Sequence, residues 1–153
     1  MVLATDQAKE IIVKSLKFLV DDGRIVLNGF VVMDNHIHII WQPTIKYSLT
    51  QIQSSFLSHT AKALLAELTV SNASLKEKLI VNKNDRKYQV WKREPLSIEL
   101  YTEKVFLQKL NYIHYNPFSA QLVSTPENYK FSSAKFYYTG VDDFSMITHY
   151  SGN

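Results

Sequence analysis

Two histidines one residue apart, His36 and His38, are the first side chains whose type and spacing could do chemistry. They lie in the run HIHIIWQ, residues 36–42, whose alternation of polar and apolar residues predicts a β-strand. Because successive side chains of a strand point to opposite faces, both imidazoles would project from one face and could share a metal ion. Taken alone, such a pair is more often two ordinary surface histidines, so this spacing does not establish a metal site.

A second group of chemically active side chains lies in the run NYIHYNP, residues 111–117. Tyr112 and Asn116 are four residues apart, so on a helix they would share a face and present a hydroxyl beside an amide. The commoner alternative is that Tyr112 packs against a sheet while Asn116 ends the helix before Pro117. The residues alone favour this structural alternative.

Composition limits the chemistry that these side chains can support. The chain has 153 residues, 46% of them hydrophobic, and no cysteine, which predicts one folded domain over residues 1–153. Without cysteine, thiolate catalysis, disulfides, zinc knuckles and iron–sulfur centres are excluded, and a metal would depend on histidine, carboxylate or amide ligands. The polar N-terminus and the lack of a long apolar run predict no membrane span and favour the cytoplasm.

The net charge of +3 is concentrated in the middle of the chain. Residues 1–42 carry a net charge of −1, residues 43–100 carry +4 and residues 101–153 carry zero. The densest stretch runs from Lys76 to Arg93. It is either a solvated loop, which is the commoner case, or a phosphate-binding surface.

Three residues at the end of this stretch, Trp91, Lys92 and Arg93, combine an indole ring with two cations. Such a group could stack on a base and bind phosphates of a single-stranded nucleic acid. A core tryptophan flanked by solvated charges is equally consistent with the sequence. Lys62, farther up the chain, could also reach DNA or simply lie on a helix surface.

Three helices are expected to position these groups. The pattern of apolar residues predicts helices at residues 7–20, after an N-cap at Asp6, and at about residues 48–68. A third helix would open at Thr102 and stop at Pro117, because the residue before a proline avoids the α conformation.

Two strands complete the predicted core. Residues 24–33 and 36–42 should pair as a hairpin with a tight turn between them. Residues 69–87 are dominated by polar and charged side chains and give no clear boundaries, and the residues from 118 onward predict short packed pieces. The fold class predicted from this order is α+β.

Together these fragments resemble a known family, the HUH single-strand DNA transposases with one tyrosine, and in particular the IS200-like and REP-associated tyrosine transposases. The resemblance covers about residues 7–140 in matching order and spacing. The motifs that carry it are VVMDNHIH (31–38), VWKR (90–93), QKLNYIHYNP (108–117), PENY (126–129) and SSA (132–134).

The resemblance implies a role for each site residue. His36 and His38 would be the metal-binding pair, Tyr112 the nucleophile and Asn116 a third metal ligand, whereas Tyr115 is not at the nucleophile position. The family uses Mg²⁺ or Mn²⁺ and no nucleotide cofactor to cleave and rejoin single-stranded or hairpin DNA through a 5′-phosphotyrosine. Trp91, Lys92, Arg93 and Lys62 would contact the DNA. The implied fold is a ferredoxin-like antiparallel sheet with helices on one face.

The chemistry of these side chains limits that role. An ordinary tyrosine, with a pKa of about 10, is ionised only about one part in a thousand at pH 7, a deficit of about 4 kcal/mol. A divalent ion would help by neutralising charge on the phosphate oxygens and by orienting that group. Since two imidazoles and an amide are all neutral ligands, we expect weak metal binding without DNA.

The start of the chain departs from the family pattern. Family members usually have an aromatic strand before the first helix, a central strand of the sheet, whereas only MVLATD precedes the helix here. The sequence therefore predicts a sheet that lacks its first strand. An unpaired strand edge would favour a homodimer.

Three functions are compatible with the sequence. The first is a metal-dependent DNA strand transferase or endonuclease, and the second is an inactive, truncated remnant that only binds DNA or a partner. The third is an unrelated hydrolase of small phosphoesters, in which the change Tyr112→Phe would leave turnover intact. These alternatives differ in whether a covalent DNA adduct forms on the tyrosine.

Overall fold

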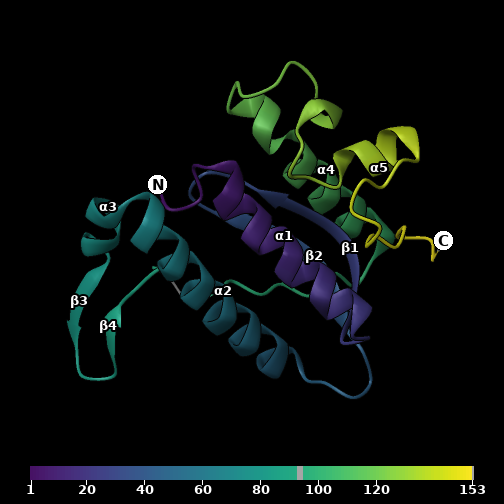
Figure 1. Ribbon diagram of the computed structural model, residues 1–153. Helices are drawn as coiled ribbons and strands as arrows, with labels where there is room; N and C mark the ends of the chain where they lie inside the picture. The colour runs from purple at the N-terminus through teal and green to yellow at the C-terminus, as the bar shows by residue number, and fades with distance from the viewer. Residues whose placement is uncertain (93–94, 153) are drawn as a thin grey trace.

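A computed structural model of the chain describes residues 1–92 and 95–152 and has the predicted α+β architecture (Figure 1). Its first helix, α1 (Asp6–Asp21), lies where the apolar pattern predicts it. The N-cap is Thr5 rather than Asp6, since the Thr5 side chain accepts a hydrogen bond from the Ala8 amide at 3.2 Å. Asp6 instead occupies the first turn, where its negative charge favours the helix N-terminus.

The predicted hairpin is confirmed. β1 (Ile25–Val32) and β2 (Ile37–Pro43) pair antiparallel, and Val31 lies opposite His38. A bulge between Leu27 and Gly29 shifts the alternation of side chains along β1. As a result Leu27 and Phe30 point to one core cluster and Val31 points to another.

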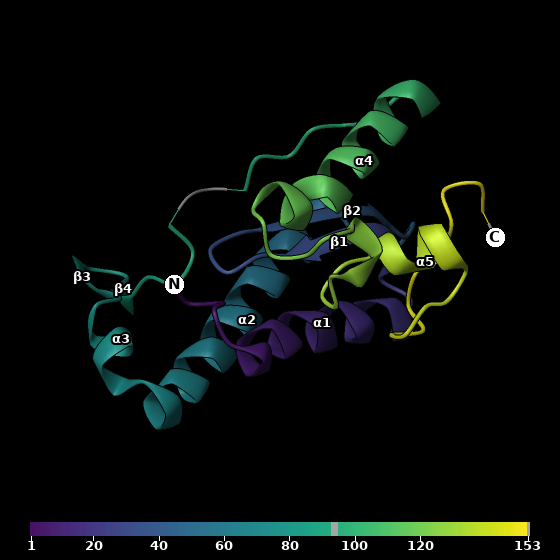
Figure 2. The ribbon, with the colours of Figure 1, turned by 90° about the horizontal axis from the view of Figure 1, so that it is seen from above.

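Helices cover both faces of this hairpin, as Figure 2 shows. α1 and α2 (Leu49–Ser71) cover one face, where the larger core contains Ile12, Leu16, Phe30, Phe56 and Leu64. α4 (Glu103–Ser119) covers the other face through Leu110 and Ile113, which pack with Val31 and Ile40. The expectation of helices on one face is therefore wrong, because seven of the eight residues of β1 are buried and both of its faces need cover.

Pro117 does not stop α4, contrary to the sequence prediction. The helix starts as expected at the Thr102 cap, whose side chain accepts a hydrogen bond from the Val105 amide, but it continues to Ser119. Pro117 lies in the last turn, and the helical hydrogen bond from Ala120 to the Asn116 carbonyl forms beyond it. Near a helix end a proline removes one backbone hydrogen bond, and its ring is buried here.

The two edges of the hairpin sheet differ. Two C-terminal segments of the same chain cover the outer edge of β1 through backbone hydrogen bonds of 2.8–3.0 Å. The Val32 amide donates to the Phe131 carbonyl, the Ser133 amide to the Phe30 carbonyl and the Thr148 amide to the Leu27 carbonyl. Within the described residues, β2 pairs with β1 alone. The described strands thus form two small two-stranded sheets, and a ferredoxin-like sheet is not among them.

The second sheet lies in the polar segment whose boundaries the sequence left open. It follows the short helix α3 (Ala73–Glu77) and consists of β3 (Ile80–Lys83) and β4 (Arg86–Tyr88). The C-terminal part forms the predicted short pieces, η1 (Pro126–Asn128) and α5 (Ala134–Thr139). In the part of the chain that the structure describes, every helix is too short or too polar to span a bilayer.

Candidate functional site

The turn between β1 and β2 places both histidines on one face of the sheet. His36 lies in this turn, where its carbonyl accepts a hydrogen bond from the Met33 amide at 2.9 Å, and His38 follows inside β2. The centroids of the two imidazole rings are 5.0 Å apart. Ile37 and Ile39, between and after them, pack into the core on the opposite face, so the predicted alternation is confirmed.

α4 crosses this face and brings Tyr112 and Asn116 to the histidines. The Asn116 amide nitrogen lies 3.3 Å from His36 Nε2. The rings of His38 and Tyr112 meet edge to face with centroids 5.7 Å apart. Tyr112 is 62% exposed, so a polymer could reach its hydroxyl. These four residues, which we call the histidine–tyrosine site, therefore lie together.

One separation within the histidine–tyrosine site, that between Asn116 and His36, is compatible with two ligands of a divalent ion. Adjacent ligands of an octahedral ion at about 2.1 Å lie about 3 Å apart, close to the separation of Asn116 and His36. His36 Nδ1 lies 2.7 Å from Asn35 Oδ1, and donation to this oxygen would keep the proton on Nδ1 and leave Nε2 unprotonated, the form that binds a metal. Burial, and then the charge of His36, lower the pKa of His38 and favour its neutral, ligating form.

The three side chains that could ligate an ion, His36, His38 and Asn116, include no carboxylate. Among the described residues, no group of three or more histidine, cysteine, aspartate or glutamate side chains could hold a metal ion. The third donor that the geometry offers is an amide, whose oxygen and nitrogen can exchange places by rotation. Two imidazoles shift the preference of such a site from Mg²⁺ toward Mn²⁺ or softer ions, while an amide oxygen, phosphate oxygens and waters would supply the hard ligands.

An ion pair between the buried Lys9 and the partly exposed Asp34, which the sequence analysis missed, holds the turn that carries His36. Lys9 is 4% exposed, and its Nζ donates to both Asp34 Oδ1 and the Leu3 carbonyl at 2.7 Å. The Leu3 amide in turn donates to the Asp34 carbonyl at 3.1 Å. The sequence does indicate that Lys9 is buried, because Lys9 precedes the buried Ile12 and Leu16 at helical spacing and therefore lies on an apolar stripe.

A second buried group fixes α4 against β1. His114 is 2% exposed, and its Nε2 lies 2.7 Å from Ser133 Oγ, which also accepts a hydrogen bond from the Phe30 amide at 2.9 Å. Burial lowers the pKa of His114 to about 4. The helix passes so close to Gly29 that an added Cβ would lie 2.7 Å from Leu110 Cδ1. We call this group the His114–Ser133 pair, and it sets where Tyr112 and Asn116 lie over the sheet.

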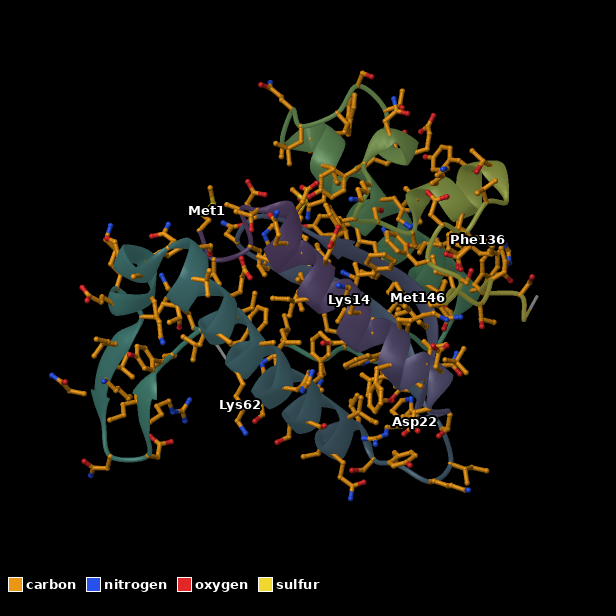
Figure 3. The ribbon with its side chains drawn as sticks, viewed as in Figure 1. Met1, Lys14, Asp22, Lys62, Phe136 and Met146 are labelled. Atoms are coloured by element: carbon orange, nitrogen blue, oxygen red, sulfur yellow. The ribbon has the colours of Figure 1, made fainter. Side chains whose placement is uncertain are left out.

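Two of the predicted DNA contacts, Trp91 and Lys62, lie with α2 rather than with α4. The Trp91 indole donates at 3.2 Å to the Leu57 carbonyl and to Thr60 Oγ1, so this ring packs against α2. Lys92 is exposed, and Arg93 lies outside the described residues. Figure 3 shows Lys62 on the side of α2 that faces away from α1, in the helix layer opposite α4.

The comparisons with known proteins assign no relative. No protein-family model, no curated protein and no solved structure matches the chain.

Proposed function

We propose that this protein is a metal-dependent enzyme that cleaves and rejoins single-stranded DNA through a covalent bond to Tyr112. The observation that carries the proposal is the meeting of four side chains: the exposed Tyr112 and Asn116 on α4, His36 in the β1–β2 turn and His38 in β2. The resemblance to the HUH transposases supports the same assignment. The chain would act as a transposase-like strand transferase that needs no nucleotide cofactor.

The covalent step needs no external energy source, because it exchanges one phosphorus–oxygen ester bond for another. The Tyr112 oxygen forms a bond to a backbone phosphorus, and the bond from phosphorus to the 3′ oxygen of the preceding nucleotide breaks. The phenolic proton is transferred through solvent to that leaving oxygen, which gives a 5′-phosphotyrosine and a free 3′-OH. Attack by a 3′-OH on the adduct reverses the step and rejoins a strand.

The chain's own residues would orient the reactants. The edge-to-face contact with His38 holds the Tyr112 ring on the histidine side of α4. His36, His38 and Asn116 would hold a Mg²⁺ or Mn²⁺ ion. When bound, this ion would neutralise charge on the phosphate oxygens. Since all three ligands are neutral, the ion would keep its full charge toward the phosphate.

An adduct assay tests the proposal. The protein is mixed with Mn²⁺ and 3′-labelled single-stranded oligonucleotides, including hairpins, and SDS-resistant protein–DNA adducts are measured on gels. We expect an adduct for the wild type and a loss of at least about a thousandfold for Tyr112→Phe. The matched control is Tyr115→Phe, a 48% exposed tyrosine on the same helix, which should form the adduct normally. Equal adduct from Tyr112→Phe would refute the proposed nucleophile.

The second candidate function is a protein that binds DNA or a partner without cutting. It is favoured by β2, whose outer edge pairs with no strand in the described residues. In the ferredoxin-like fold that the family resemblance implies, a further strand would pair with this edge of β2. A second copy of the chain could supply that strand in a homodimer. DNA binding without any adduct would favour this candidate, and the mass in solution would test the dimer.

A further inference from the structure

The two histidines of the histidine–tyrosine site are held in different ways. His38 lies inside the ladder between β1 and β2, opposite Val31, so the sheet fixes its backbone. The ladder of paired residues ends at Val32 and Ile37, and His36 lies just beyond it, in the turn. The position of the His36 imidazole therefore depends on what fixes the turn, whereas that of His38 does not.

Contacts from outside the hairpin fix this turn at Asp34, two residues before His36. Lys9 of α1 donates from Nζ to Asp34 Oδ1 and to the Leu3 carbonyl, both at 2.7 Å. The Leu3 amide donates to the Asp34 carbonyl at 3.1 Å, and Leu3 itself is buried in the larger core. Figure 1 shows the start of α1 beside the loop that joins β1 to β2. Both the side chain and the backbone of Asp34 are thus tied to the N-terminal part of the chain.

The strand that leads into the turn is held separately. The Tyr129 hydroxyl donates to the Val32 carbonyl at 2.7 Å, and the Val32 amide donates to the Phe131 carbonyl at 2.9 Å. These bonds do not involve Lys9 or Asp34. Loss of the Lys9 contacts should therefore release the residues after Val32 while β1 stays in place.

Stability alone does not account for a lysine at this place. Lys9 is 4% exposed, and burying its ammonium group costs free energy that the bonds to Asp34 and Leu3 offset. A well-packed apolar side chain of similar volume often gives the same stability. The ammonium group adds directed hydrogen bonds, which fix one residue of the turn relative to α1.

We propose that Lys9 is a positioning residue, which acts through Asp34 to hold the His36 imidazole at the distance from Asn116 that a shared metal ion requires. His36 Nε2 lies 3.3 Å from the Asn116 amide nitrogen, and such sites work only within about 0.5 Å of their productive geometry. This inference rests on the proposed function. It makes the metal affinity of the site depend on a buried residue of α1.

The variant Lys9→Met separates positioning from stability. Methionine has a similar length without the charge, and the Asp34 side chain, which is 34% exposed, can then bind water. We expect Lys9→Met to fold, with a thermal unfolding midpoint within about 5 °C of the wild type. The matched control is Leu19→Ala, a change at a buried residue toward the other end of α1, which lowers stability without touching the turn.

NMR of the metal-free protein, labelled with ¹⁵N at its five histidines, gives the first readout. In the lysine variant the ring of His36 should lose its NOE contact with the Asn116 side chain. The contact between the rings of His38 and Tyr112 should persist, because the sheet holds His38. The control should keep both contacts.

A titration with Mn²⁺ gives the second readout, the paramagnetic broadening of the His36 and His38 imidazole signals. Half-maximal broadening should require about ten- to a hundredfold more Mn²⁺ in Lys9→Met than in the wild type, as is typical when a contact that orients a metal ligand is removed. Leu19→Ala should need the same Mn²⁺ concentration as the wild type. Asp34→Ala, which removes the same bond from the turn side, should behave as Lys9→Met does.

Three results would overturn the inference. They are an unchanged contact between His36 and Asn116 in a folded Lys9→Met or Asp34→Ala, an unchanged Mn²⁺ requirement in those variants, and equal changes in Leu19→Ala. A wild type whose imidazoles do not respond to Mn²⁺ would instead contradict the metal dependence of the proposed function. The metal-free contacts distinguish that failure from a failure of the positioning role.

Discussion

The histidine–tyrosine site and the His114–Ser133 pair carry similar side chains in opposite surroundings. Both combine imidazole and hydroxyl groups between α4 and the hairpin sheet. In the first, Tyr112 is 62% exposed and the imidazoles are half-buried, whereas in the second His114 is 2% exposed and its Nε2 is bonded to Ser133. Burial, rather than residue type, separates groups that can meet a ligand from groups that hold the fold.

Changing the half-buried histidines should affect chemistry and leave stability intact. We expect His36→Ala or His38→Ala to reduce DNA-adduct formation at least about a thousandfold, because the phosphate would lose its counter-ion. The free energy of unfolding should change by less than about 1 kcal/mol at such half-exposed positions. A chelator should reproduce the loss in the wild type, and added Mn²⁺ should restore activity. A variant that unfolds, or one that retains full adduct formation, would break the comparison.

Changing the buried histidine should affect stability first. His114→Ala would leave a cavity under α4 and remove a hydrogen bond, so we expect a loss of about 3 kcal/mol in the free energy of unfolding. Urea denaturation measures this loss. His59→Ala, at an exposed position of α2, is the matched control and should change stability by less than about 0.5 kcal/mol. Equal stability of the two variants would contradict the role given to the His114–Ser133 pair.

The His114–Ser133 pair should also make stability depend on pH. Burial lowers the pKa of His114 from 6.5 to about 4, so below pH 6.5 the unfolded chain binds more protons than the folded one. The free energy of unfolding is therefore highest, as far as His114 determines it, above pH 6.5. It decreases as the pH falls toward 4, by up to about 3 kcal/mol. Denaturation at several pH values should show a shallower dependence for His114→Gln than for the wild type.

The ion pair at the β1–β2 turn should contribute less. Asp34→Ala would leave the buried Lys9 ammonium with the Leu3 carbonyl as its remaining acceptor, and we expect a loss of about 2 kcal/mol. Asp143→Ala breaks the exposed ion pair with Lys135 and should cost less than about 0.5 kcal/mol. If the two changes cost the same, the turn is not held by its buried lysine.

Local patterns in the sequence predicted much of this structure. The alternation in HIHIIWQ predicted that His36 and His38 share a face of the sheet. The spacing of Tyr112 and Asn116 predicted that both lie on one face of a helix. Their meeting across the chain could not be derived from spacing, because it depends on how α4 crosses β1 at Gly29. The resemblance supplied that expectation.

Other features depend on tertiary contacts that no local pattern encodes. Pro117 continues the helix because it falls in the last turn, and Trp91 is held by Leu57 and Thr60 of a distant helix. Covering of the β1 edge by residues near 132 and 147 likewise joins segments far apart in sequence. The buried Lys9 was missed because lysine is usually exposed, although its place on an apolar stripe indicated burial.

The central claim is that Tyr112 becomes covalently bound to DNA, and mass spectrometry of the protease-digested adduct tests it most directly. The account predicts a nucleotide linked through its 5′ phosphate to the peptide that contains Tyr112, formed only with a divalent ion. A fragment spectrum that places the nucleotide on Tyr115 or on another residue, or the absence of any modified peptide from a folded and metal-supplied protein, would contradict it.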